Sequence, residues 1–245
     1  MDIFNISFFI SALSAFLIGF SKAGIPNTGV LSITLMMSFF PCRFSLGVLL
    51  PLLLLGDLNA IYCYQKYLNY KEITKVLKVV LLGMFSGAFF FVFIENDDTF
   101  KMYVGLCLLL LSSLKFLIHI KPCFIKRRLK PMWRFIGLLG GFFTVISHTG
   151  GPFIALGLLF KKHSKEEFLC LYATLFLIIN SLKIPLLLFS ESLNKETLTL
   201  SLLGSPFVFI GAYLGYRLIP YLSKELFSLI TTVIIFLTAV FFIVW

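Results

Sequence analysis

Long apolar runs, separated by short charged stretches, follow one another along the whole chain. A helix needs roughly 20 apolar residues to cross about 30 Å of hydrocarbon, and most of these runs approach that length. The pattern therefore predicts an all-α, polytopic helical membrane protein with about eight to ten membrane segments. The expected segments are residues 3–20, 25–40, 44–62, 73–94, 101–120, 134–147, 152–161, 168–190, 197–219 and 223–245.

The apolar pattern is broken in the second half of the chain by the stretch SHTGGP (147–152). It separates the apolar residues 135–146 from 153–160, and neither piece alone is long enough to span. In a helix interior Gly costs about 1 kcal/mol and Pro about 3 kcal/mol, so we expect the helix to end here. Unwound backbone at membrane depth is tolerated only where it is buried in protein or lines a water-filled cavity. The break is therefore a candidate binding site.

A similar break occurs near the N-terminus, in the stretch GFSKAGIPNTG (19–29). A shift of 122 residues places Gly19 on Gly141 and Gly29 on Gly151. Hydrophobic segments that are interrupted at matching places in two halves of a chain point to the binding site of a transporter. The match predicts an internal duplication in which each repeat carries one Gly/Pro-broken helix.

Two further glycine pairs support this duplication. Gly83 and Gly87 fall in the fourth expected segment, and Gly211 and Gly215 fall in the ninth. Their G-x-x-x-G spacing lets helix backbones approach closely, where lipid offers no hydrophobic drive for association. The predicted organisation is a first membrane repeat at 1–120, a basic cytoplasmic linker at 121–133 and a second membrane repeat at 134–245.

Basic residues in the connections indicate the orientation of the chain. Five segments per half would make the second repeat enter the membrane from the opposite side, so the repeats would be inverted. With the N-terminus outside, the inner connections carry 15 basic residues and the outer ones three, as the positive-inside rule requires. The alternative places the N-terminus inside and treats 25–40 and 152–161 as re-entrant. It leaves eight full spans but moves Lys161, Lys162 and Lys165 outside, so we prefer the inverted arrangement.

Composition narrows the class of protein further. A hydrophobic content of 59% with 13% charged residues excludes a soluble domain and makes the lipid bilayer the main partner. The formal net charge of +10 does not indicate nucleic-acid binding, because the basic residues lie in short loops beside apolar spans. The five cysteines are scattered without a C-x-x-C motif, which favours packing over metal or redox chemistry. We therefore expect neither a cofactor nor a metal site.

The two glycine-rich breaks resemble those of the TauE/SafE family of sulfite and organosulfonate exporters, also called the toluene sulfonate uptake permease family. In the second break, Gly150, Gly151 and Pro152 match the family's glycine-rich motif followed by proline. The first break departs from it, since residues 26–28 (PNT) stand where family members show more glycine. The resemblance covers essentially the whole chain. It implies secondary transport of a small, often sulfur-containing anion across the inner membrane of a bacterium.

Charged side chains within the expected spans need a reason, because each costs at least about 2.5 kcal/mol on insertion scales. Lys183 either faces the substrate path or extends along the helix to the outer surface. Asp57, with Asn59, could serve as a partner for a cation or as a proton-coupling group. The alternative is a helix-end carboxylate that water reaches at the inner interface. Lys22 in the first break either holds an anion together with free backbone N–H groups or anchors the chain at the inner interface.

Polar residues of the two breaks complete the candidate site. His148 lies within the second break, where contact with a ligand, satisfaction of the backbone and proton coupling are all open to it. Asn180 lies in the same expected span as Lys183. The predicted substrate-binding residues are Lys22, Gly24, Asn27, Thr28, Gly29, Asp57, Asn59, Ser147, His148, Thr149, Gly150, Gly151, Asn180 and Lys183.

The leading hypothesis is a secondary transporter for a small anion, and an anion channel of similar architecture is the alternative. An intramembrane enzyme that uses Ser147, His148 or Asp57 is disfavoured. Such catalysis needs a base within about 3 Å of the nucleophile, and side chains adjacent in sequence rarely point at each other. The chain also contains no H-E-x-x-H or G-x-S-x-G motif. We therefore expect no enzymatic activity.

Overall fold

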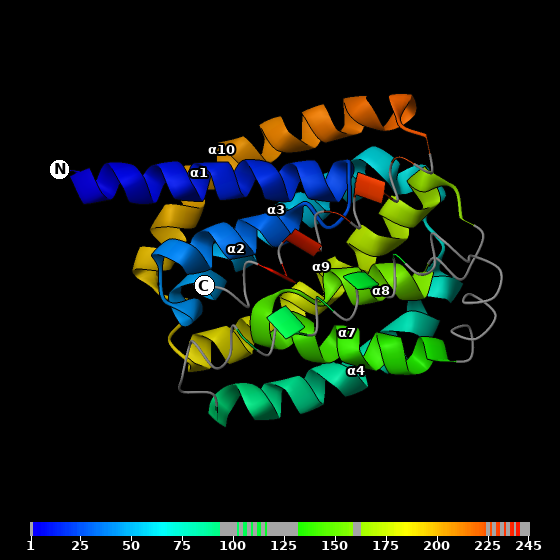
Figure 1. Cartoon of the computed structure of the whole chain (residues 1–245), viewed down its shortest axis with the longest axis horizontal. Helices are drawn as coiled ribbons and strands as arrows, with labels where there is room; N and C mark the ends of the chain where they lie inside the picture. The colour runs from blue at the N-terminus through cyan, green and yellow to red at the C-terminus, as the bar shows by residue number, and fades with distance from the viewer. Residues whose placement is uncertain are drawn as a thin grey trace. The chain divides into compact units, whose positions relative to one another are not determined.

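All regular elements in the described part of the chain are helices, and no strand occurs there (Figure 1). The structure is a computed structural model. It describes residues 2–93, 132–158 and 163–223, with the single positions 102, 105, 106, 109, 112, 113, 116, 226, 229, 230, 233, 236, 237, 239 and 240. The prediction of an all-helical fold is thereby confirmed.

The chain separates into two compact units, Met1–Asn69 with Lys165–Ser223 and Tyr70–Ser164 with Lys224–Trp245. Each unit takes segments from both predicted repeats. Unit 1 contains α1 (Asp2–Ala23), α2 (Gly29–Phe39), α3 (Cys42–Tyr64), the short η1 (Gln65–Tyr67), α9 (Lys165–Phe189), α10 (Lys195–Leu218) and η3 (Ile219–Tyr221). Unit 2 contains α4 (Tyr70–Phe93), α7 (Trp133–Ser147) and α8 (Gly151–Leu158).

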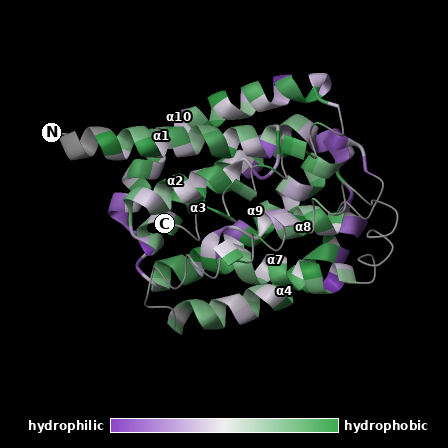
Figure 2. Cartoon of the chain, in the orientation of Figure 1, coloured by the Kyte–Doolittle hydropathy of each residue, from purple (hydrophilic) through white to green (hydrophobic). Residues whose placement is uncertain are grey.

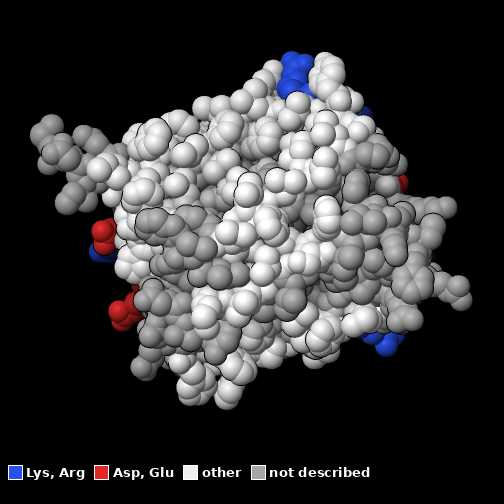
Figure 3. Space-filling view, viewed as in Figure 1, with Lys and Arg blue, Asp and Glu red and all other residues white. Residues whose placement is uncertain are grey.

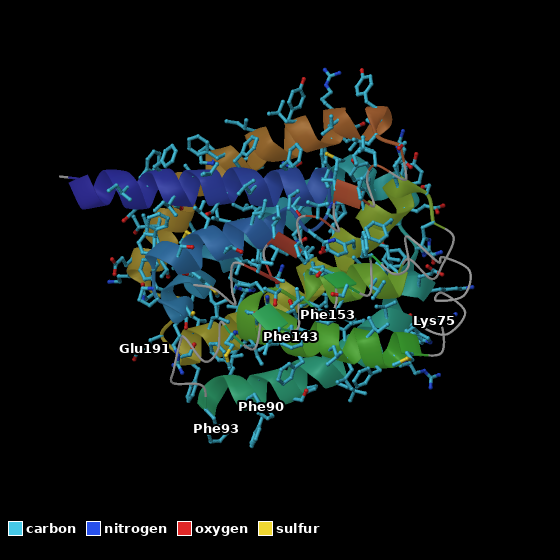
Figure 4. The ribbon with its side chains drawn as sticks, viewed as in Figure 1. Lys75, Phe90, Phe93, Phe143, Phe153 and Glu191 are labelled. Atoms are coloured by element: carbon cyan, nitrogen blue, oxygen red, sulfur yellow. The ribbon has the colours of Figure 1, made fainter. Side chains whose placement is uncertain are left out.

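Five of the described helices are long and apolar enough to cross a membrane, namely α1, α3, α4, α9 and α10. Hydrophobic residues run along the labelled helices, and the described surface in view carries few charged side chains (Figures 2 and 3). Phe90 and Phe93 of α4 are more than half exposed (Figure 4), as expected of side chains that face lipid. These helices begin and end within a few residues of the expected bounds. The expected segments 101–120 and 223–245 and the linker 121–133 lie largely outside the described residues.

Helices α1 and α10 lie side by side in unit 1 because glycines face backbone at their contact (Figure 1). A Cβ atom at Gly19 would collide with the carbonyl oxygen of Val208 and would lie 2.8 Å from Ala212 N. Across the contact, a Cβ at Gly211 would collide with the carbonyl oxygen of Phe16. The close backbone approach predicted for the G-x-x-x-G pair of α10, Gly211 and Gly215, is confirmed.

Helices α4 and α7 make the corresponding contact in unit 2. A Cβ at Gly141 would collide with the carbonyl oxygen of Val80 and would lie 2.9 Å from Met84 N. A Cβ at Gly83 would in turn collide with the carbonyl oxygen of Leu138. The second G-x-x-x-G pair therefore also serves close helix packing.

The two helix contacts are equivalent residue by residue. The shift of 122 residues that relates the breaks also carries Phe16 to Leu138, while a shift of 128 carries Val80 to Val208 and Met84 to Ala212. In each pair, the first helix of one predicted repeat packs on the fourth helix of the other. This repetition supports the predicted duplication, whereas the inverted orientation of the repeats remains a prediction.

Candidate functional site

The first helix break separates α1 from α2 at residues 24–28, all of which are buried. Asn27 has a φ of 71°, in the left-handed region that a helix does not use. The Thr28 hydroxyl donates to the carbonyl oxygen of Ile25 at 2.9 Å and so satisfies one backbone group of the unwound segment. Gly24 packs against α10, since a Cβ there would lie 2.6 Å from Gly215 Cα. The Gly/Pro signal thus produces a true interruption of the helix.

Lys22, in the last turn of α1, forms a buried ion pair with Asp57 of α3. Its Nζ lies 2.6 Å from Asp57 Oδ1. Asn180 of α9 donates from Nδ2 to the other oxygen, Asp57 Oδ2, at 2.8 Å. Asp57 and Asn180 are fully buried, and Lys22 is 5% exposed. Three helices that are distant in sequence therefore converge on one carboxylate.

Aromatic rings of α9 cover the Lys22 ammonium. Its Nζ lies 4.3 Å from the ring centroid of Phe176 and 5.6 Å from that of Tyr172. Such contacts stabilise a cation, more so when water is excluded. Gly56 leaves room for the stem of Lys22, because a Cβ there would lie 3.1 Å from Lys22 Cγ.

Lys183 adds a second buried ammonium group to this cluster. It is 1% exposed and interacts electrostatically with both Lys22 and Asp57. Among the described residues, these three are the buried Lys, Arg, Asp or Glu side chains. The cluster therefore contains two lysine side chains and one aspartate side chain. Each buried charge carries a desolvation cost of several kcal/mol, which only a close opposite charge or ligand offsets.

The burial of these three residues excludes the surface positions that the sequence left open for them. Lys183 does not extend to the outer surface, Lys22 is not an interfacial anchor, and Asp57 is not a wetted helix-end carboxylate. Asn59 lies elsewhere, because side chains two positions apart on a helix point about 200° apart. It lines a groove of about 540 Å³ between α3 and α10, where it accepts a hydrogen bond from the Cys63 thiol.

Sequence reasoning missed several residues around the cluster. The positions 172, 176, 180 and 183 lie within about 80° of one another on the surface of α9, and this spacing could have revealed Tyr172 and Phe176. Tyr64 also lay outside the prediction. Its hydroxyl donates to the carbonyl oxygen of Ala23 at 2.7 Å, which satisfies a backbone group at the end of α1. No local signal in the sequence announces that contact.

The second break lies in unit 2 between α7 and α8. His148 has a φ of 56°, and α8 begins at Gly151, the position that the shift of 122 residues pairs with Gly29 at the start of α2. The Ser147 and Thr149 hydroxyl groups share a hydrogen bond of 2.6 Å. All three polar residues of the break are buried. The predicted correspondence of the two breaks therefore extends to the first residue of the following helix.

Close packing surrounds this second break. A Cβ at Gly150 would collide with the carbonyl oxygen of Gly140 and would lie 2.6 Å from Thr144 Cβ. The rings of Phe143 and Phe153 stack across the break with centroids 5.2 Å apart (Figure 4). These contacts fix the two half-helices to each other within unit 2.

The described helices define a multi-pass membrane protein with an ion cluster buried beside a broken helix. No group of three or more His, Cys, Asp or Glu side chains suited to a metal occurs among the described residues. The sequence profile described as "Sulfite exporter TauE/SafE" matches residues 11–242, and the chain belongs to that family. The family expected from the glycine-rich breaks is confirmed. No curated protein and no solved structure matches the chain significantly.

Proposed function

We propose that the protein is a secondary transporter that binds a small anion at the cluster of Lys22 and Lys183. The observation that carries the proposal is that, among the residues the structure describes, two buried lysines, Lys22 and Lys183, gather at one buried carboxylate, that of Asp57. An anion is the ligand that would balance the charge of the second lysine. The family description favours a sulfur oxyanion such as sulfite. We propose the inner membrane of a bacterium as the site of transport.

The neighbourhood of the cluster suits a partly dehydrated anion. Such an ion loses hydration on entering a low-dielectric site and needs N–H donors and positive charge in exchange. The break that follows Lys22 leads into the N-terminal end of α2 at Asn27, Thr28 and Gly29, and a helix N-terminus favours negative charge. The amides of Val30 and Leu31 there donate to the carbonyl oxygens of Asn27 and Thr28 at 3.0 Å. Within unit 1, Lys22 and this helix terminus therefore belong to the same short stretch of chain, whereas Lys183 comes from α9.

We include the residues of the second break among the proposed anion-binding residues because of the groups that they carry. Ser147, His148 and Thr149 offer hydrogen-bonding groups, and Gly150 and Gly151 leave the backbone uncovered by side chains of their own. The Ser147 hydroxyl also lies 3.2 Å from the carbonyl oxygen of Phe143. Together with its bond to Thr149, this arrangement resembles the satisfaction of a helix end more than the activation of a nucleophile, and we propose no enzymatic activity.

Counterflow tests the proposal. Vesicles that contain the purified protein and unlabelled sulfite should accumulate labelled sulfite transiently above its outside concentration. Lys183→Met should abolish this exchange, because the anion loses one of its two counter-charges. Lys195→Met, which removes an exposed lysine from the start of α10, is the matched control and should exchange normally.

Other outcomes would identify a different function. Sulfite conductance without transient accumulation would indicate the alternative, an anion channel. Equal exchange by Lys183→Met and the wild type would remove Lys183 from the site. No exchange or conductance of any sulfur oxyanion or carboxylate by the wild type would overturn the proposed transport function.

A further inference from the structure

The carboxylate of Asp57 stands in the way of the proposed anion site. It forms an ion pair with Lys22. Because it is negative, it repels any anion that approaches the two lysines. Displacement of the carboxylate would leave it buried without its closest counter-charge, which is strongly unfavourable. A bound anion and an ionised Asp57 therefore compete for the same cation.

We propose that Asp57 is a proton-binding site, which takes up one proton when an anion replaces its carboxylate at Lys22. The inference rests on the proposed transport function and deepens it to proton-coupled anion transport. The new O–H bond forms with a proton from the side on which the anion enters. The bond breaks on the other side, where the anion leaves and Lys22 Nζ returns to Asp57 Oδ1. In this scheme the transported proton binds to and leaves Asp57, and no covalent bond forms to the anion.

Charge counting favours this coupling. The empty cluster, with two ammonium groups and one carboxylate, has a formal charge of +1. A cluster with a bound monoanion, such as hydrogensulfite or a sulfonate, and a protonated Asp57 again has a charge of +1. The loaded and the empty carrier therefore present the same net charge to the low-dielectric surroundings. Neither state is penalised relative to the other by an unbalanced buried charge.

Asn180 provides a partner for both protonation states of Asp57. Its Nδ2 donates to the carboxylate, while its Oδ1 is buried and has no hydrogen-bond partner among the described residues. A protonated Asp57 needs an acceptor for its new hydroxyl group. Rotation of the Asn180 amide by half a turn would present Oδ1 to that hydroxyl. Reversible protonation of Asp57 would thus give Asn180 Oδ1 a hydrogen-bond partner in the protonated state.

The charged surroundings of Asp57 are simple. Lys22 of α1 and Lys183 and Tyr172 of α9 are the titratable groups with electrostatic interactions with Asp57 in the described structure. Helix α2 contains no titratable side chain. The titratable residues of α10 and η1 have no electrostatic interaction with Asp57 in the described structure. They are Lys66, Tyr67, Lys195, Glu196, Tyr213, Tyr216 and Arg217.

Asp57→Asn separates proton coupling from anion binding, because asparagine resembles a permanently neutral carboxyl group. In vesicles at equal pH on both sides, the rate at which this variant exchanges labelled for unlabelled sulfite measures the anion binding that remains without the carboxylate, and gradient-driven accumulation is compared with that rate. With an alkaline interior, wild-type protein should accumulate sulfite beyond the level of protein-free vesicles, and Asp57→Asn should not. Under each condition sulfite is protonated identically in vesicles with wild-type protein and in vesicles with the variant, so the difference between the two proteins reports Asp57. Glu196→Gln, which neutralises an exposed carboxylate of α10, should retain both activities.

Gradient-driven accumulation by Asp57→Asn equal to that of the wild type would overturn the inference and leave the transporter assignment intact. Absence of exchange by the wild type would instead overturn the transport function. If the variant does not fold, infrared difference spectra of wild-type protein decide the question. Addition of sulfite should produce the C=O band of a protonated carboxyl group at the expense of a carboxylate band, and Asp57→Glu should shift that band. A spectrum without it would contradict the inference.

Discussion

At the scale of single residues, the competition at Lys22 has a thermodynamic signature. Removal of one member of a buried ion pair costs about 3–5 kcal/mol, because the remaining charge has lost its partner. Loss of Asp57 leaves the two lysines of this cluster, and in the proposed function an added anion would take the place of the carboxylate. Stability and anion binding should therefore be linked through the same residue.

We predict that Asp57→Asn lowers the free energy of unfolding by about 3–5 kcal/mol without anion. We further predict that sulfite raises the melting temperature of this variant more than that of the wild type, since a ligand that binds only the folded state stabilises it by mass action. Thermal unfolding in detergent, with and without sulfite, measures both effects. Glu196→Gln should behave like the wild type, and an equal sulfite shift in Asp57→Asn would contradict the proposed competition.

At the scale of helices, glycines determine which pairs come together. The same two collisions, a Cβ against a carbonyl oxygen and against a backbone nitrogen one turn later, would occur at Gly19 in unit 1 and at Gly141 in unit 2. Close approach of two helices is the principal source of their association where lipid surrounds them. A side chain at either glycine should therefore separate its helix pair.

We predict that Gly19→Val and Gly141→Val each lose at least about 1–3 kcal/mol of stability, because backbone atoms cannot move aside as a side chain can. Gly157→Val is the matched control. Gly157 also lies in a helix, α8, but a Cβ there would meet nothing within 4 Å. The folded fraction by size-exclusion chromatography and the melting temperature provide the measurement. Equal loss in all three variants would show that helix propensity rather than packing is responsible.

Sequence predicted these helices well where the signal is local. Glycine and proline act on their own backbone, so the breaks could be predicted. The starts of the following helices were predicted less well, since α2 begins at Gly29 rather than at residue 25 and α8 begins at Gly151 rather than at residue 152. The partners of Lys22 could not, since they depend on how α1, α3 and α9 pack. The same limit applied to Lys183, whose position within its span left two directions open until its burial was known.

At the scale of the whole molecule, the orientation of the chain in the membrane is open to direct test. The basic connections predict that reporter fusions after residues 70, 128 and 164 are cytoplasmic, and that fusions after 97 and 193 are external. Fusions after 70, 164 and 193 follow described helices, so they also test those helices as spans. An external reporter after 164 would contradict the inverted arrangement and favour re-entrant segments.

The pairing of helices from opposite ends of the chain also sets the order in which the protein can be completed during synthesis. Ser11 of α1 donates to the carbonyl oxygen of Leu200 in α10 at 3.0 Å, across a sequence separation of 189 residues. When the ribosome has released α1 into the membrane, the surface that will receive α10 has no native partner yet. The side of α1 that carries Ser11 and Gly19 must remain open, or be held by insertion factors, until translation is nearly finished. Nascent chains arrested before residue 195 should therefore contain a protease-sensitive first helix that becomes resistant only when α10 has been made.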